Sequence, residues 1–408
     1  MRDTTVLRRL LAIPAVRICA VELGPQGLIV DVRLRRGTRL RCSACSFTTR
    51  ARYDRRPARL WRHLDLVGRR CYLRMGVRRL RCPEHGVVTE AVPFAPARSG
   101  YTYATEDLVA WLAQRADKTA ITLLARISWR SVGRILERWM ARHRSGDQLD
   151  GLRCIAIDEK SWRKGHRYVT VVADHERPRI VWIGEGRKPE TLLRFVGELG
   201  PARAAALQAI SLDMGAAYLK ALERAALPAE ICFDPFHVVA LANRALDAVR
   251  REEWNRARQS GMLARAVKYT RWALLKHPAR LSIDQRHTLR LVRRHNARLW
   301  RGYEIKEMVR AIYGARTPVE AEIWLRAAIG AARRSRLRPF GTLANTLRQH
   351  QAGILAAVRH GLSNSRLEGL NSRLALINHR ASGFHSVGAF MALALLCTGG
   401  FEPALPHQ

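Results

Sequence analysis

The chain has 408 residues, with 72 Lys and Arg against 34 Asp and Glu, which gives a formal net charge of +38 at pH 7. This length predicts two or three domains with ample core. This excess of positive side chains favours nucleic acid over a membrane surface as the partner, because a bound polyanion relieves the repulsion between the positive charges. The most apolar stretch, residues 390–397, is far shorter than the roughly 20 residues of a transmembrane helix. We therefore exclude an integral membrane protein and expect a cytoplasmic location.

Residues 1–95 are predicted to form a small β-rich zinc-binding domain, opening with two strands joined by a Gly-Pro-Gln-Gly turn. Cys42 and Cys45, and then Cys82 and His85, form two pairs of ligands, each with two intervening residues. Two such turns close a tetrahedral zinc site without an open position, so we predict one structural Zn²⁺ ion. The other cysteines lie in apolar runs and are expected to be reduced core thiols.

Residues 101–146 are predicted to form an α-helical helix-turn-helix DNA-binding domain, in which Ser128 caps the second helix. On one face of that helix an arginine recurs every four residues, at Arg130, Arg134, Arg138 and Arg142. A solvated arginine face would explain this stripe in an ordinary protein. Beside the net charge of this chain, we favour a helix that lies on DNA. Arg126 occupies the turn where Gly is frequent, so contact with the DNA backbone is expected more than base readout.

Residues 152–237 read as the first part of an α/β core, in which short apolar runs end on Asp158, Asp213 and Asp234. Two carboxylates held a few ångströms apart repel each other, and a fold tolerates this when a divalent cation lies between them. Oxygen ligands suit Mg²⁺ or Mn²⁺, and a pair of such ions serves in-line displacement at phosphorus. The alternative is that each Asp only ends its strand as a turn residue.

Residues 238–360 contain no convincing strand and are predicted to be a large α-helical insertion, with proline at its breaks. Its Trp residues receive no role. Residues 361–400 are predicted to return to the core as its last helix.

The last predicted helix has three different faces. Leucines form a buried face, and Arg366, Arg373 and Arg380 recur seven apart on another face, where they could follow a phosphate backbone. The third face carries Asn364, Glu368 and Asn371, which makes Glu368 a candidate third metal ligand. The alternative for Glu368 is a capping box with Ser365, which needs no metal.

Four blocks resemble those of bacterial insertion-sequence transposases of the ISL-three family, and they occur in the order of that family: IDEKSWRKGHRYVTVVAD, SLDMGAAYLKAL, CFDPFHVVALAN and LSNSRLEGLNSRLALINHRASGF. The resemblance implies a ribonuclease-H-like α/β catalytic core with an Asp, Asp, Glu triad, carried here by Asp158, Asp213 and Glu368. It also implies an N-terminal zinc-binding domain. The chain departs from the family pattern at Ser382, where an aromatic is usual, and at Gly215, where a larger residue is common.

The fold class that follows is a ribonuclease-H-like core with a large α-helical insertion, preceded by the zinc-binding and helix-turn-helix domains. Asp234 and His237 match a D-x-x-H motif of related transposases, and His237 is expected either to orient a phosphate or an Asp carboxylate, or to begin a helix. Asn364 and Asn371 are expected near the site.

The resemblance implies a transposase that binds the terminal inverted repeats of its element and catalyses Mg²⁺-dependent strand cleavage and strand transfer, with two ions in the site. It further implies at least a dimer on double-stranded DNA, and a location at the bacterial nucleoid. Two alternatives remain: a DNA-binding regulator that kept an inactive nuclease-like scaffold, and a host nuclease without end specificity.

Overall fold

The computed structural model describes residues 3–13, 15–258, 267–362 and 365–405. The chain divides into two compact units, each described by itself below. Unit 1 comprises Met1–Arg144 with Ile377–Gln408, and unit 2 comprises Ser145–Leu376. Among the described residues, no helix combines the length and the apolar character that crossing a bilayer requires.

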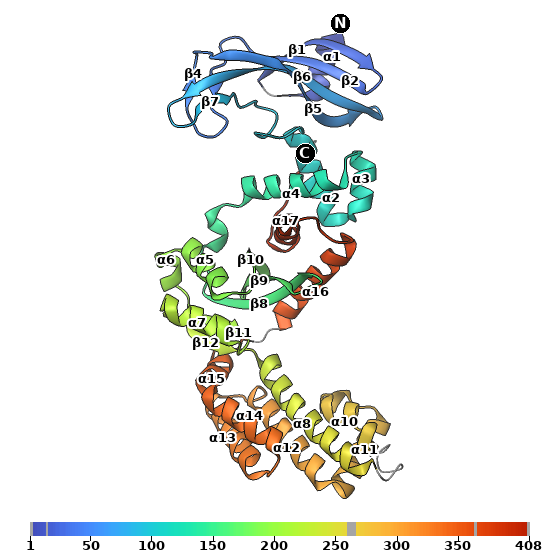
Figure 1. Cartoon of the computed structure of the whole chain (residues 1–408), viewed down its shortest axis with the longest axis vertical. Helices are drawn as coiled ribbons and strands as arrows, with labels where there is room; N and C mark the ends of the chain where they lie inside the picture. Colours follow the sequence, from blue (N-terminus) through green and yellow to red (C-terminus); the bar gives the residue numbers. More distant parts are fainter. Residues whose placement is uncertain (1–2, 14, 259–266, 363–364, 406–408) are drawn as a thin grey trace. The chain divides into compact units, whose positions relative to one another are not determined.

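The first part of unit 1 is a β-rich layer (Figure 1). Its elements are α1 (Asp3–Leu11), β1 (Val16–Gly24), β2 (Gly27–Leu34), β3 (Leu40–Arg41), β4 (Thr48–Thr49), β5 (Asp54–Leu66), β6 (Arg69–Cys82) and β7 (Gly86–Thr89). The large sheet has the order β1-β2-β6-β5, with β7 on β6, and only β2 and β6 are parallel within it. Val67 and Gly68 at the tip of the β5–β6 hairpin have φ of 49° and 71°, the left-handed pair that a tight hairpin turn requires.

The second part of unit 1 is helical. Its helices are α2 (Tyr103–Arg115), α3 (Lys118–Ala125), α4 (Trp129–His143) and α17 (Val387–Thr398). The side chains of Thr102, Asp117 and Ser128 cap the first three of these helices, which confirms the predicted cap at Ser128. Helix α17 packs on α2 and α4. Gly133 permits this close packing, because a Cβ there would lie 2.3 Å from His385 Cε1.

The sheet of unit 2 has the order β10-β9-β8-β11-β12. Its strands are β8 (Cys154–Arg163), β9 (Arg167–Asp174), β10 (Arg179–Glu185), β11 (Ala209–Leu212) and β12 (Glu230–Phe233). Strands β8, β9 and β10 are antiparallel neighbours, whereas β11 is parallel to both β8 and β12. One face packs on α5 (Pro189–Leu199), α6 (Pro201–Ala205) and α7 (Ala216–Ala225) through an apolar core.

Helices fill the rest of unit 2, without a strand among described residues 235–258 and 267–362. They are α8 (Pro235–Ala257), α10 (Arg271–Leu275), α11 (Ile283–His295), α12 (Ala297–Ile312), α13 (Pro318–Arg334), α14 (Arg338–Gln349) and α15 (Gln351–Arg359). They share one apolar core that includes Leu246, Val309, Phe340 and Leu347. Helix α16 (Ser365–Arg380) follows, and the boundary between the two units falls within it. These mixed sheets and helices are compatible with the predicted fold class.

Candidate active site and zinc centre

Four predicted ligands come together in unit 1. Cys42 and Cys45 follow β3, Cys82 ends β6, and His85 lies in the turn to β7. Cys82 Sγ lies 3.6 Å from Cys45 Sγ and 3.6 Å from His85 Nδ1, and Cys42 Sγ lies 4.0 Å from the same nitrogen. Ligand atoms around a tetrahedral zinc, with Zn–S bonds of about 2.3 Å, are about 3.7 Å apart.

All four ligand atoms lie within 4.8 Å of one another, and they are the only such group of His, Cys, Asp or Glu among the described residues. The donor set and its spacing therefore fit zinc. Cys42 and Cys82 are buried beside Leu40 and Leu80. With four protein ligands and no open position, the site is suited to holding the fold together, not to catalysis.

The acids of unit 2 are aligned by strand register. Ala209, Ile210 and Ser211 of β11 pair with Cys154, Ile155 and Ala156 of β8. Two residues after the last of these pairs, Ser211 with Ala156, the same register brings Asp213 opposite Asp158. On the other side of β11, Leu212 pairs with Phe233 of β12, so the next residue, Asp234, is in line with Asp213. Adjacent strands lie about 4.8 Å apart, and the three acids thus occupy neighbouring positions across three strands.

Alternation along the strands decides which face carries these acids. Ile155, Ile157, Ile210 and Leu212 point into the apolar core beneath α5 and α7. Cys154, Ala209 and Cys232 belong to a different cluster, with Ala356 and Ala357 of α15. Because side chains two residues apart share a face, Asp158, Asp213 and Asp234 are on the α15 side of the sheet.

Helix α16 reaches this face through Asn371. Its Nδ2 donates a hydrogen bond of 2.6 Å to Asp158 Oδ2. Its Oδ1 is buried and has no hydrogen-bond partner among the described residues. Glu368 lies three residues earlier in α16, and its side chain is outside the described residues, as is the whole of Asn364. Positions three apart share one face of a helix.

The carboxylate of Asp213 folds back on its own chain, accepting a hydrogen bond of 2.9 Å from the Gly215 amide. A Cβ at residue 215 would lie 2.7 Å from Asp213 Oδ1. The larger residue that is common in the resembled family would therefore force this carboxylate to move.

Negative charge accumulates around the two aligned acids. Burial raises the pKa of the Glu159 carboxyl, and the charges of Asp213 and Asp158 raise it further against the lowering effect of Arg187. Burial also raises the pKa of Tyr218, with the same three acids contributing. In a chain this basic, neither Asp158 nor Asp213 has an Arg or Lys ion-pair partner among the described residues, which is the environment that a bound cation would relieve.

Asp234 has a different environment. It is buried, and its side chain caps α8 by accepting a hydrogen bond of 3.0 Å from the Phe236 amide. His237 Nε2 lies 3.6 Å from Asp234 Oδ2, so both readings predicted for His237 are compatible with the geometry: it stands in the first turn of a helix and beside a carboxylate. The Phe236 ring between them in sequence is 66% exposed.

The arginine stripe of α4 is divided in the structure. Arg138 and Arg142 both pair with Glu106 of α2, a fully buried acid. Arg130 and Arg134 are exposed and have no ion pair among the described residues. The first pair joins α4 to α2, and only the second pair is free to meet a ligand. Arg126 at the turn has a left-handed backbone conformation, with φ of 50°. Its Nη2 donates a hydrogen bond to the carbonyl oxygen of Gly68 at the tip of the β5–β6 hairpin.

The arginines predicted on α16 are also in different environments. Arg373 is exposed in unit 2. Arg380 is half-buried in unit 1 and lines an apolar cavity beside Lys118 and Phe384. The side chain of Arg366 lies outside the described residues.

Comparison with known proteins decides the family. A family model described as transposase, of the ISL3 group, matches residues 155–394. Models described as the helix-turn-helix domain of transposase family ISL3 and as the zinc-finger of transposase IS204/IS1001/IS1096/IS1165 match residues 90–140 and 38–85. The chain belongs to the ISL3 family of transposases. The resemblance noted in the sequence is thereby confirmed, with its zinc-finger, helix-turn-helix and transposase domains.

Two curated relatives span nearly the whole ISL3 chain. The transposase for insertion sequence element IS1557 of Mycobacterium tuberculosis is 37% identical over 404 residues, which covers 93% of this chain and 90% of the relative. The transposase for insertion sequence element IS1001 of Bordetella parapertussis is 29% identical over 351 residues, or 84% and 85% of the two chains. The predicted function, DNA transposition, is confirmed at this level, and nothing favours the inactive regulator.

Sequence reasoning missed three residues of this ISL3 transposase. Glu159 adds a third carboxyl group near Asp158 and Asp213, paired with Arg187, and the tandem acids at residues 158–159 were a visible signal for it. Gly215 was noted only as a departure from the family, although its lack of a side chain leaves room for the Asp213 carboxylate. Glu106 had no signal, because only packing shows that it is buried between two arginines.

Proposed function

We propose that this transposase cleaves and joins DNA by Mg²⁺-dependent phosphoryl transfer at Asp158, Asp213 and Glu368, within a ribonuclease-H-like core. The observation that carries the proposal is the register that aligns Asp158 with Asp213, together with the hydrogen bond that ties α16 to Asp158. Three antiparallel strands followed by two parallel strands, with helices on both faces, support the core assignment.

The donor set fits magnesium. The carboxylates of Asp158 and Asp213 have no cationic partner among the described residues. Beside them lies the buried Oδ1 of Asn371, which has no hydrogen-bond partner in the same part of the chain. Mg²⁺ prefers oxygen ligands and keeps several waters, so two or three protein carboxylates suffice. Asp158, Asp213 and Glu368 would hold the two ions. When bound, these ions supply charge stabilisation for in-line displacement at phosphorus, and Mn²⁺ would serve similarly.

The protein's own groups position the reaction. Asn371 fixes one oxygen of Asp158, and the Gly215 amide fixes one oxygen of Asp213. In the first step a water oxygen bonds to phosphorus and the 3′ oxygen leaves as a hydroxyl. In the second step that 3′-hydroxyl attacks a phosphodiester of target DNA, and the target strand's own 3′ oxygen leaves. His237 beside Asp234 would either orient a phosphate or the carboxylate, or serve only to begin α8.

DNA contacts are proposed for the exposed arginines. Arg130 and Arg134 on α4 would follow the backbone of the terminal inverted repeats, and Arg373 on α16 would do so near the acids. Arg138 and Arg142 would support this surface indirectly by holding α4 through Glu106. Because two ends must be joined in concert, we propose at least a dimer on DNA.

The decisive experiment incubates the protein with Mg²⁺ and a duplex that carries the element end, and maps strand nicks beside the repeat. Asp213→Asn should abolish nicking while leaving duplex binding intact, because it removes a metal ligand but no backbone contact. Asp284→Asn, a change at an exposed acid of α11, should nick as the wild type does. Normal nicking by Asp213→Asn would refute the assignment.

A further inference from the structure

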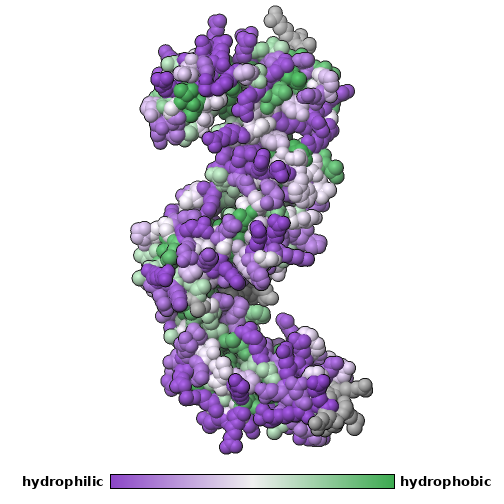
Figure 2. Space-filling model, viewed as in Figure 1, coloured by the Kyte–Doolittle hydropathy of each residue, from purple (hydrophilic) through white to green (hydrophobic). Residues whose placement is uncertain are grey.

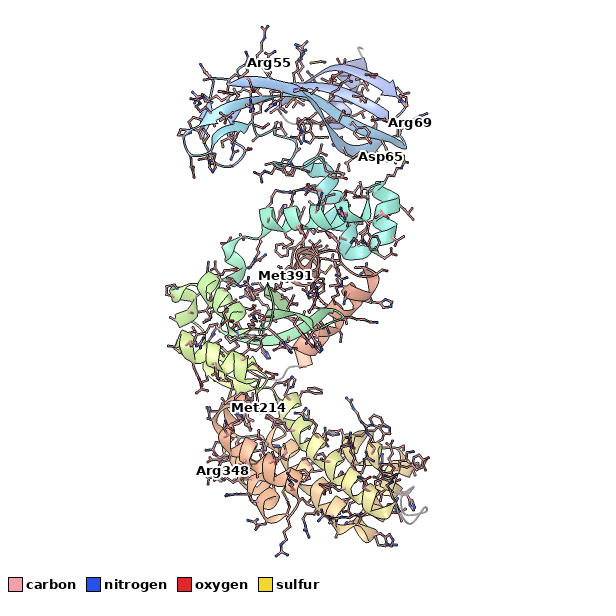
Figure 3. All side chains as sticks on the ribbon, in the orientation of Figure 1. Arg55, Asp65, Arg69, Met214, Arg348 and Met391 are labelled. Carbon is pink, nitrogen blue, oxygen red and sulfur yellow. The ribbon has the colours of Figure 1, made fainter. Side chains whose placement is uncertain are left out.

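The helical insertion carries a basic groove. It has a volume of about 500 Å³ and lies between α13 and the junction of α14 with α15. Its lining residues are Arg326, Ile329, Gly330, Arg333, Arg334, Arg348 and Gln351. Figure 3 labels Arg348 on α14, and Figure 2 shows hydrophilic residues over much of the visible surface of this helical body.

The charge of the groove is almost uncompensated. Arg326 pairs with Glu322 one turn earlier on α13. Arg333, Arg334 and Arg348 are exposed and have no ion pair among the described residues. The sequence explains why, since it contains no Asp or Glu between Glu322 and Glu368. Ordinary solvated helix surfaces mix both signs of charge, so a stretch this long without an acid indicates an anionic partner.

Gly330 shows that the groove is shaped as well as charged. A glycine inside a helix costs about 1 kcal/mol relative to alanine. At this position a Cβ would lie 3.2 Å from Arg334 Nη1, so the bare backbone gives the guanidinium room to lie along α13. A planar guanidinium that lies there can present its fork of donors to phosphate oxygens.

The lining of the groove continues into α15, which packs on the strand that leads to Asp234. His350, between the two lining residues Arg348 and Gln351, has its ring 4.9 Å from that of Phe233. Gly353 packs so tightly on Phe233 that a Cβ there would lie 2.6 Å from the ring. Phe233 is followed directly by Asp234, which is in line with Asp213 and Asp158. The groove and the acids are thus joined through α15, which covers the face of the sheet that carries them.

We propose that this groove binds the sugar–phosphate backbone of the same duplex whose reacting phosphodiester lies at Asp158 and Asp213. The inference rests on the proposed function for its substrate. The helical insertion then acts as a second backbone clamp beside the reaction centre, independent of the helix-turn-helix. Because the contacts are to phosphates, they add affinity without sequence preference.

The test measures the affinity of the full chain for duplex DNA, without Mg²⁺, between about 50 and 200 mM salt. The Arg333→Ala, Arg334→Ala, Arg348→Ala triple variant should bind less tightly. Its plot of log K against log salt should flatten by about 0.9 for each lost phosphate contact, or roughly 2 to 3 in total. An element-end duplex and an unrelated duplex should lose affinity equally. The corresponding triple Arg→Lys variant, which keeps the charges, should retain most of the slope.

The matched control removes the same three charges elsewhere in the insertion, through Arg280→Ala, Arg290→Ala and Arg294→Ala at exposed positions outside the groove. It should keep the slope of the wild type. Equal flattening in both variants, an unchanged slope in the groove variant, or a loss confined to the element end would each overturn the proposal. If the groove variant does not fold, the single variant Arg348→Gln replaces it. Its plot of log K against log salt should flatten by about 0.9. Nicking by the wild type and by Asp213→Asn tests the proposed function separately.

Discussion

The zinc centre and the acidic site are built in opposite ways. The zinc ligands come from two short turns within one β-rich layer, and all four ligand atoms are already within 4.8 Å of one another. The acids come from three strands of unit 2, and the helix that meets them, α16, begins more than a hundred residues after Asp234. The first arrangement closes around its metal, whereas the second leaves like charges side by side. The comparison teaches that a closed set of Cys and His ligands suits a structural metal, whereas the repulsion between the aligned acids suits the metal-dependent reaction that we propose for them.

Removing a zinc ligand should give the largest effect on folding. Cys82→Ser should release the metal, because three ligands cannot close the tetrahedron, and structural zinc sites bind with about 10 kcal/mol or more. Zinc content by atomic emission and thermal unfolding would measure this. Cys19→Ser, at an exposed cysteine outside the cluster, should keep both values unchanged. Full zinc occupancy in Cys82→Ser would contradict the structural role of the zinc site. A large loss of stability in Asp213→Asn would contradict the view that the acids do not hold the fold together.

Glu106 is a buried acid with two arginine partners, in contrast to Asp158 and Asp213, which have no ion pair in the described part of the chain. Glu106→Gln should destabilise the protein by about 3 kcal/mol, because Arg138 and Arg142 lose the charge that compensates them. Chemical denaturation would show this as a lower midpoint. Glu402→Gln, at an exposed acid of the same unit, serves as the control. A change below about 0.5 kcal/mol, the size expected for a surface site, would contradict the structural role given to Glu106.

The link between α16 and the sheet can be tested at Asn371. Asn371→Ala should raise the Mg²⁺ concentration needed for nicking and lower activity by about 10- to 100-fold, as expected for a group that orients a metal ligand. A titration of nicking against Mg²⁺ separates this from a general defect. Asn345→Ala, at an exposed position of α14, should behave as the wild type. If the Mg²⁺ requirement is unchanged, Asn371 does not position Asp158.

The smallest expected effect concerns the pH dependence of unit 1. Burial lowers the pKa of His63 to about 4, where its Nδ1 lies 2.9 Å from Thr102 Oγ1. The unfolded chain takes up this proton near pH 6.5 and the folded chain only near pH 4, so stability falls as pH falls between those values. Between pH 7 and pH 5.5 the loss should be about 1 kcal/mol. Urea midpoints for the wild type and His63→Gln should differ less at pH 5.5 than at pH 7. A difference independent of pH would contradict the buried neutral histidine.

The candidate sites were partly visible in the sequence because some of their signals are local. The spacing of Cys42 with Cys45, and of Cys82 with His85, is a property of two tight turns, and the structure gathers those four residues. Asp158 and Asp213 stood out because each follows an apolar run of strand length. The arginine period on α4 was also visible. The sequence did not show that only two of these four arginines are free of ion pairs in the described residues. Periodicity cannot reveal that Arg138 and Arg142 bind Glu106 of another helix.

By itself the sequence determined the family, the zinc ligands, the strand-end acids and the excess of positive charge, all of which depend on residue type and short spacing. Only the tertiary structure decided that β11 pairs in parallel with β8, which brings Asp213 level with Asp158. It alone placed Asn371 on Asp158, packed α17 on α4, and gathered arginines from α13 and α14 into one groove. The reason is physical: these contacts join segments far apart in the chain, and their register is fixed by burial and packing, which no local pattern encodes.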